Sequence, residues 1–304
     1  KKKRNRNHRA PAPTAALALG ACSNDDENAV NGVDLSKPIS LSFSPAPLDV
    51  QTRATIGVTG ASFESGDQVG VYVDGAGYSN ILYTCGGASW STASDLYWPD
   101  AGTYTFRAYY PYMETGDGAV ALPADQGTKE AFTQADRMWT SAARAASNGN
   151  ITLTLEHKMS LIKLDVSEGE AITLDDIKAM TPAIHGTIST AGTWDLTTGA
   201  ISLAADATTV TGITPYRVDN GTSVTYYALV IPGTTFEEGD RFLSLTDAEG
   251  TTYSYELNIS GGFTAGQSQY CDIDLTVNRT GISLSGFGIG NWTPGQSGSG
   301  TVEI

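Results

Sequence analysis

The stretch that decides the fold is Ile151-Thr152-Leu153-Thr154-Leu155, in which apolar and hydroxyl-bearing residues alternate strictly. Successive side chains of a β-strand point to opposite faces of its sheet, so a period of two buries one face and leaves the other in water. An α-helix would spread these three apolar side chains around its circumference. The sequence therefore predicts a half-buried β-strand at residues 151–155.

The same alternation recurs on both sides of this stretch. It is found at residues 39–43, 69–73, 104–109, 162–166, 224–230, 242–245, 253–257 and 273–277. Turn pairs such as Asn220-Gly221 and Glu249-Gly250 separate the runs, and helical periodicity is scarce, with short helical turns expected at residues 128–146. Many short strands divided by turns predict an all-β chain of β-sandwiches, with an N-terminal domain at 39–157 and a C-terminal domain with a terminal extension at 158–304.

The start of the chain has the pattern of a targeting segment. A basic run over residues 1–9 precedes a small, moderately apolar stretch that ends in Leu19-Gly20-Ala21-Cys22. Such a stretch is too short to span a bilayer, so residues 1–21 are interpreted as a signal peptide. The tetrapeptide resembles a bacterial lipobox, which implies cleavage before Cys22 and acylation of its sulfur. An ordinary signal peptide with a cysteine at the cleavage site is the alternative.

The charge of the remaining chain excludes some partners. Residues 1–21 hold six of the 18 Lys and Arg residues and none of the 33 Asp and Glu residues, which leaves twelve basic against 33 acidic residues, a formal charge of −21. Such a surface repels phosphates and anionic membranes, so we predict no nucleic-acid partner. Residues 22–38 are polar, acidic and without periodicity, which indicates a tether.

Residue patterns for catalysis or metal binding are weak. His157 and His185 stand apart, and Asp272 and Asp274 are more typical of a strand face than of a calcium loop. We therefore predict no catalytic residue, no cofactor and no metal site, and the chain is not expected to be an enzyme. Cys85 and Cys271 remain either a pair or two free thiols, because sequence cannot show their proximity.

A family resemblance rests on motifs in a fixed order. They are Phe63-x-x-Gly66-Asp67, Tyr97-Trp98-Pro99, Tyr109-Tyr110-Pro111-Tyr112, Asp136-x-Met138-Trp139, Leu155-x-His157-x-Met159-Ser160 and Ile289-x-x-Trp292. Together they resemble the fimbrillin family of Bacteroidetes-type bacteria over residues 39–292. The resemblance implies subunits of a type V pilus, with two transthyretin-like β-sandwich domains in tandem. It also implies a surface-exposed lipoprotein of the outer membrane and the fimbrium, held to the membrane only through the Cys22 lipid.

The resemblance further implies an assembly mechanism. A trypsin-like protease would cut between Arg53 and Ala54, and the chain has no other basic residue between Lys37 and Arg107. The cut would release a lid strand that carries Ile39, Leu41 and Phe43, and a strand from a neighbouring pilin subunit would fill the groove. An exposed strand edge and bare apolar side chains favour such pairing.

Two questions stay open at this level. The donor strand could be the C-terminal tail, but residues 293–304 are rich in Gly and Ser, and the stretch with Ile282, Leu284 and Phe287 alternates better. The alternative function is a lipid-anchored surface lipoprotein that binds a glycan, or a ligand on a host or bacterial surface, through exposed aromatic side chains without polymerising.

Overall fold

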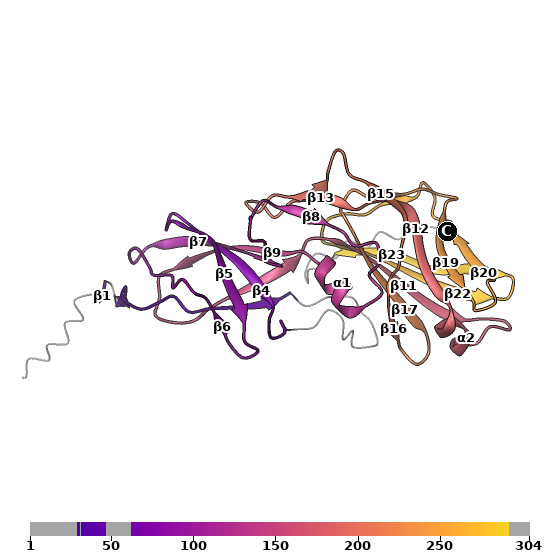
Figure 1. Ribbon diagram of the computed structural model, residues 1–304, viewed down its shortest axis with the longest axis horizontal. Coiled ribbons are helices and arrows are strands. Elements are labelled where there is room, and N and C mark those ends of the chain that lie inside the picture. The colour runs from indigo at the N-terminus through magenta and orange to yellow at the C-terminus, as the bar shows by residue number, and fades with distance from the viewer. Residues whose placement is uncertain (1–28, 31, 47–61, 292–304) are drawn as a thin grey trace, which may run out of the picture.

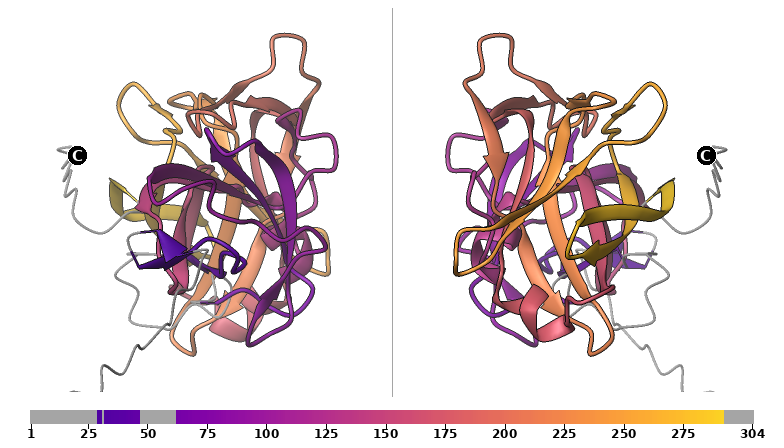
Figure 2. Two further views of the ribbon diagram at one scale, coloured as in Figure 1. Left: turned by 90° about the vertical axis from the view of Figure 1, so that its left-hand side faces the viewer. Right: turned by 90° about the vertical axis from the view of Figure 1, so that its right-hand side faces the viewer.

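The structure is a computed structural model that describes residues 29–30, 32–46 and 62–291. Strands form most of this part of the chain, as the alternating sequence predicts, and the chain is all-β. The strands form two bodies, which follow one another along the long axis of the molecule (Figure 1). Figure 2 looks along that axis, where the ribbons of the two bodies overlap.

The first body is one curled sheet. Within the described residues it has seven strands in the order β3-β10-β9-β7-β4-β5-β6. These strands are β3 (Leu41–Pro45), β4 (Gln68–Asp74), β5 (Tyr78–Cys85), β6 (Trp90–Ser91), β7 (Thr103–Tyr110), β9 (Met138–Ala145) and β10 (Ile151–His157). The two strands at opposite ends of this order, β3 and β6, contact each other. The sheet therefore encloses its own apolar face, which we call the first core.

The second body is a sandwich of two sheets. One sheet has the order β16-β17-β11-β22-β23 and the other has the order β15-β12-β19-β20. The first contains β11 (Ser160–Glu168), β16 (Tyr216–Asp219), β17 (Val224–Val230), β22 (Gln269–Asn278) and β23 (Gly281–Asn291). The second contains β12 (Thr181–Ser189), β15 (Thr209–Ile213), β19 (Arg241–Thr246) and β20 (Thr252–Glu256). Their inner faces bury the second core.

Short elements complete the chain and join the bodies. They are β1 (Ala29–Val30), β2 (Val33–Asp34), β8 (Ala119–Ala121), β13 (Ala191–Trp194), β14 (Ile201–Leu203), β18 (Thr235–Phe236), β21 (Phe263–Thr264), α1 (Lys129–Ala135) and α2 (Leu174–Ala179). Strand β8 pairs with β13, and Val120 and Phe132 pack in the second core. Residues 119–135 thus precede the predicted domain boundary at 157 in sequence but belong to the second core, and the boundary itself stays a prediction.

The segment where short helical turns were expected holds one short helix followed by one strand. Helix α1 covers Lys129–Ala135, and Thr128 caps it by accepting a hydrogen bond from the Ala131 amide at 3.1 Å. Residues 138–145 instead form β9, which pairs with β7 along its whole length. Pairing with a distant strand overrode the local preference there. Neither described helix is long and apolar enough to cross a bilayer.

Candidate assembly site

The predicted lid lies on the edge of the first sheet as strand β3. It begins at Leu41, two residues later than predicted, and runs parallel to β10, with Leu41 opposite Ile151 and Phe43 opposite Leu153. Ile39 precedes the strand, and its amide donates to the Leu96 carbonyl at 2.7 Å. The three lid side chains are buried, with 7%, 5% and 7% of their surface exposed in chain order. They close the open side of the first core.

Hydroxyl groups line the outer face of this strand pair. Ser42 Oγ lies 2.9 Å from Thr152 Oγ1, and Ser44 Oγ lies 3.2 Å from Thr154 Oγ1. Asn150 Nδ2 also donates to Ser42 Oγ at 2.8 Å. Polar groups on the outer face and apolar groups on the inner face fix which way β3 faces, because a shift of one residue would exchange the two sets.

An aromatic pocket holds the end of the lid. The Phe43 ring meets Trp90 with centroids 4.8 Å apart and Tyr83 with centroids 5.4 Å apart, both edge to face. Trp90 in turn contacts Phe63 with centroids 5.3 Å apart. Edge-to-face pairs of this kind stabilise beyond the area that they bury. The Tyr83 hydroxyl is buried and has no hydrogen-bond partner in the described part of the chain.

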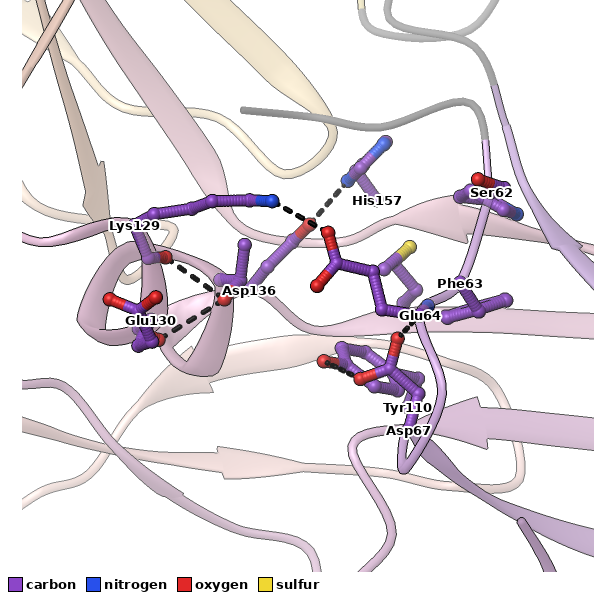
Figure 3. A pocket seen from close by; sticks show the side chains of 12 residues that line it. Ser62, Phe63, Glu64, Asp67, Tyr110, Lys129, Glu130, Asp136 and His157 are labelled. Carbon is purple, nitrogen blue, oxygen red and sulfur yellow. Dashed lines mark hydrogen bonds and ion pairs between the residues drawn. The ribbon is translucent and has the colours of Figure 1, made fainter. Parts of the chain in front are cut away.

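A buried, hydrogen-bonded pair of side chains, His157 and Asp136, fastens the chain directly after the lid. His157 Nδ1 lies 2.6 Å from Asp136 Oδ2 (Figure 3). His157 Nε2 lies 3.3 Å from the Ala46 carbonyl oxygen. Both side chains are almost fully buried. Because Ala46 is the last described residue before residues 47–61, this contact holds the end of the lid where the chain leaves it.

A cavity of about 120 Å³ adjoins the His157–Asp136 pair. Its lining includes Pro45 and Ser62. Pro45 is followed by Ala46, the last residue described before residues 47–61, and Ser62 is the first residue described after them. Carboxylates surround the cavity: Glu64 pairs with Lys129 at 2.6 Å, and Asp67 accepts a hydrogen bond from the Tyr110 hydroxyl at 3.1 Å (Figure 3). The described chain therefore stops before residues 47–61, and resumes after them, beside the same cavity, whose lining is rich in carboxylates.

The candidate donor residues lie in the second body, on strand β23. This strand pairs antiparallel with β22 at the edge of its sheet, and Ile282, Leu284 and Phe287 are half-buried against the second core. The register shifts between the partners of Asp274 and Leu275, which leaves Ser285 as an extra residue. The lid and the candidate donor therefore belong to different sheets of one chain.

The remaining processing residues lie outside the described residues. These are the lipidation candidate Cys22 and the cleavage pair Arg53 and Ala54. They stay predictions.

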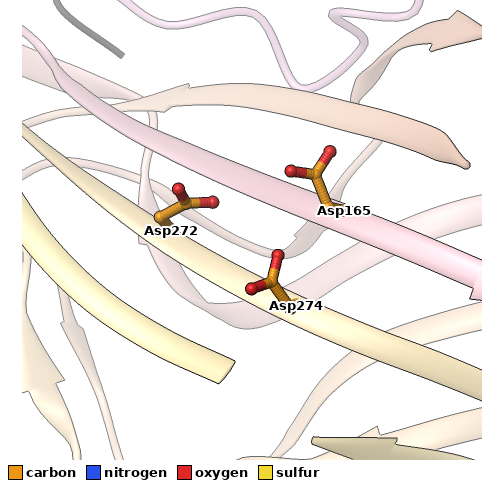
Figure 4. A group of neighbouring side chains, drawn as sticks. All are labelled: Asp165, Asp272 and Asp274. Atoms are coloured by element: carbon orange, nitrogen blue, oxygen red, sulfur yellow. The ribbon is translucent and has the colours of Figure 1, made fainter. Parts of the chain in front are cut away.

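Three acidic residues gather on the outer face of the second body, two of which the sequence had singled out. Asp165, Asp272 and Asp274 place carboxylate oxygens within 4.8 Å of one another (Figure 4). Lys163 lies 2.6 Å from Asp165 and 2.9 Å from Asp272, so an ammonium group already compensates the cluster. Burial raises the pKa of the Asp272 and Asp274 carboxyls. The arrangement is an ion-pair network.

The two cysteines of the described chain are free and buried, which resolves the alternative that the sequence left open. Burial raises the pKa of the Cys271 thiol and makes it a poor nucleophile. The aromatic residues that could have bound a glycan are mostly internal: Tyr83, Trp98, Phe106 and Tyr109 are buried, and Tyr97 is 38% exposed. Most of the aromatic side chains in the described part of the chain therefore pack in or against the two cores.

Sequence reasoning missed the role of Asp136 and His157. Both residues stand in motifs quoted for the family resemblance, but the motifs are about twenty residues apart and nothing local indicates their contact. Strands β9 and β10 bring them together, because His157 pairs with Met138 in the antiparallel register. The two residues lie at the open end of the β9–β10 hairpin, Asp136 just before β9 begins and His157 where β10 ends.

Comparisons with known proteins bear on the family and the fold. The model of the fimbrillin-like family matches residues 52–292. A candidate fimbrium subunit of Bacteroides uniformis, Fim1C, is 27% identical over 94% of this chain and 95% of its own. A candidate cell adhesion protein of Bacteroides ovatus superposes with a TM-score of 0.66 at 18% identity, over 86% of this chain and 99% of its own. Another from Bacteroides uniformis gives 0.60 at 23% identity, over 84% and 99%.

The two solved structures share the fold, and the family match extends over most of the chain, including all of the strands from β4 to β23. The protein belongs to the fimbrillin-like family.

Proposed function

We propose that this protein is a subunit of a surface pilus, made as a lipoprotein precursor, cut after Arg53 and polymerised with other pilin subunits by strand exchange at the β3 site. The observation that carries the proposal is the position of β3, an edge strand that fills the first core but hydrogen-bonds to only one neighbour, β10, in the described sheet. Family membership and the relation to Fim1C support the pilus.

Cleavage would turn the lid strand from a tethered part of the chain into a separate peptide that makes the same contacts. While the chain is intact, β3 is tethered to the body and its effective concentration at the groove is high. After a cut between residues 53 and 54, the same contacts must hold a separate peptide. Loss of that peptide would uncover the backbone edge of β10 and the side chains of Leu153 and Leu155, which favour pairing with another strand.

The same account gives the other partners their roles. A trypsin-like protease performs the cut, and the acyl chain on Cys22 carries the precursor to the outer membrane, where it is exposed at the surface. Removal of residues 22–53 then frees the subunit from that anchor. Adhesion to a host or bacterial ligand would be a property of the assembled fimbrium.

The N-terminal mass of the protein recovered from the cell surface tests the proposal. We expect the assembled form to begin at Ala54, Arg53→Ala to retain the preceding segment and stay unassembled, and Lys37→Ala to behave as wild type. Lys37 is the matched control because it is the nearest preceding basic residue and is exposed. An acylated Cys22 joined to an intact Arg53–Ala54 bond in assembled material would contradict the proposal and favour a permanently anchored lipoprotein.

A further inference from the structure

Both ring nitrogens of His157 face oxygen atoms. His157 Nδ1 lies 2.6 Å from a carboxylate oxygen of Asp136, and His157 Nε2 lies 3.3 Å from the carbonyl oxygen of Ala46. A carbonyl oxygen and an ionised carboxylate can only accept hydrogen bonds. A neutral imidazole has one N–H and would turn the lone pair of its other nitrogen towards an oxygen, whereas an imidazolium donates to both. The geometry therefore fits the charged form of His157.

The surroundings of Asp136 favour the same form. Asp136 is 6% exposed, and its Oδ1 atom is buried without a hydrogen-bond partner in the described part of the chain. A buried carboxylate is costly unless an opposite charge compensates it. His157 is the basic side chain that contacts this carboxylate, whereas the Arg137 guanidinium donates to the backbone carbonyl oxygens of Gln134 and Asp136. A proton on His157 therefore supplies the missing charge.

The other titratable groups near His157 add negative charge and no spare cation. Those that line the adjacent cavity or flank His157 in the chain are Glu64, Asp67, Tyr110, Lys129, Glu130, Glu156 and Lys158 (Figure 3). Each of the two lysines already pairs with a glutamate, at 2.6 Å for Lys129 and 2.8 Å for Lys158. Burial raises the pKa of the Tyr110 hydroxyl, so this group stays neutral. The carboxylates that remain favour a charged imidazole.

We propose that the proton on His157 Nε2 controls how firmly the lid is held: His157 is an imidazolium while β3 is in place, and loss of this proton as the pH rises loosens the end of β3 at Ala46. This inference rests on the proposed function, since it concerns the release of the lid. It makes that release depend on pH as well as on cleavage.

The direction of the effect follows from the position of the proton. The Ala46 carbonyl oxygen accepts a hydrogen bond from Nε2 only while that nitrogen is protonated, so the lidded state binds this proton more tightly than the uncovered state. The lid is therefore held most firmly at low pH and less firmly once the proton is lost. The bond from the Ala46 amide to the Leu155 carbonyl, at 2.7 Å, does not titrate and persists at every pH. Cleavage thus remains the first requirement for release.

The first test measures how fast the lid peptide leaves the cut protein at different pH values. The chain is cut with a trypsin-like protease, and size-exclusion chromatography with mass spectrometry follows the peptide that ends at Arg53. Buffers from about pH 5 to about pH 9 cover the range in which histidine titrates. We expect the release rate of wild type to rise about tenfold across this range, the effect of losing one hydrogen bond to a charged group.

Two histidine variants locate the effect. His157→Gln has no titrating ring and should release the lid peptide at a rate that does not change with pH. His185→Gln is the matched control, because His185 is a half-buried histidine of the second body whose Nε2 lies 2.8 Å from Ser244 Oγ. It should keep the dependence of wild type. The same pH dependence in His157→Gln as in wild type would overturn the inference.

The second test leaves the protein unmutated, so that a folding defect cannot explain the outcome. NMR of the uncut chain, labelled with nitrogen-15 in histidine, reports whether each ring nitrogen carries a proton. We expect two N–H groups on His157 at low pH, and loss of the Nε2 proton over the same interval in which the lid peptide leaves faster. A single N–H on His157 throughout that range would overturn the inference.

The results separate the two proposals. Wild-type chain that is cut after Arg53 but keeps its lid peptide at every pH contradicts the proposed function itself. Release at one rate across the whole pH range, followed by polymer formation, leaves the proposed function standing and overturns this inference.

Discussion

The four residues Ile-Ser-Leu-Ser occur at 39–42, where they lead into β3, and at 282–285 in β23, and yet the two strands are held in different ways. Strand β3 runs parallel to its neighbour and buries its apolar side chains. Strand β23 runs antiparallel to its neighbour, contains an extra residue and leaves its apolar side chains half-buried. A local pattern decides which side chains face a core, whereas the partner strand and the depth of burial come from the rest of the fold. The predictions below test how far that difference reaches.

The largest expected effect is at the aromatic position. Phe43→Ala should lower the free energy of unfolding by about 3–5 kcal/mol, the usual cost of removing a buried Phe ring. Phe287→Ala should cost roughly half of that or less, because its ring is half-buried. Urea unfolding followed by tryptophan fluorescence measures both values. Equal losses would show that the two strands are held equally firmly.

The glycines of β23 give the next effect. A Cβ at Gly290 would lie 2.5 Å from the Tyr270 ring, whereas a Cβ at Gly288 meets nothing within 4 Å. Gly290→Ala should therefore destabilise by about 1–3 kcal/mol through overpacking. Gly288→Ala should be neutral or stabilise by about 0.4–1 kcal/mol through the unfolded chain. Thermal unfolding of the two variants compares them, and a stabilised Gly290→Ala would contradict the close approach.

The hydroxyl groups on the outer face of β3 contribute less. Ser42→Ala removes the contacts with Thr152 and Asn150 and should cost about 0.5–1.5 kcal/mol. Ser285→Ala in β23, where the described residues offer that hydroxyl no hydrogen bond, is the control and should be silent. Chemical denaturation resolves the difference. A loss at Ser285 as large as the loss at Ser42 would refute a special role for the hydroxyl pairs.

The smallest expected effect is a pH dependence of the free energy of unfolding that arises from Asp274, on β22 beside β23. Burial, and then the charge of Asp165, raise the pKa of the Asp274 carboxyl above its ordinary value of 3.8. The folded state therefore holds this proton more tightly than the unfolded chain, and the charged carboxylate weakens the fold once the pH exceeds the raised pKa. Asp274→Asn should be more stable than wild type at neutral pH, and the gain should vanish as the pH falls below 3.8.

Unfolding curves across this pH range provide the measurement. Asp206→Asn, at an exposed carboxyl, is the control and should show no gain at any pH. A gain for Asp274→Asn that persists in acid would point to packing and not to ionisation.

The apolar runs of the sequence predicted the positions of several strands well. The run at residues 224–230 coincides with β17, and the run at 151–155 lies within β10. Residues 138–145 were misassigned, because the small residues of Ser141-Ala142-Ala143 are compatible with a helix until a strand such as β7 pairs with them.

The site itself was predictable only in part. The three residues that the sequence assigned to a lid are buried at the edge of the first sheet, and their role as a lid stays a prediction. The parallel pairing with β10 and the contact of Asp136 with His157 join residues far apart along the chain. Periodicity carries no information on such contacts, because it describes one strand at a time.

The Leu196 carbonyl oxygen, on the loop after β13, accepts hydrogen bonds from two residues of the first body, Arg107 at 2.9 Å and Trp139 at 3.0 Å. Gly199 lies against the Trp139 ring, where a Cβ would come within 2.5 Å. Bending the molecule between the two bodies would break both hydrogen bonds to the Leu196 oxygen at once. The consequence is hydrodynamic: we expect the two bodies to tumble in solution as a single elongated rod, with one anisotropic rotational diffusion tensor that describes both ends.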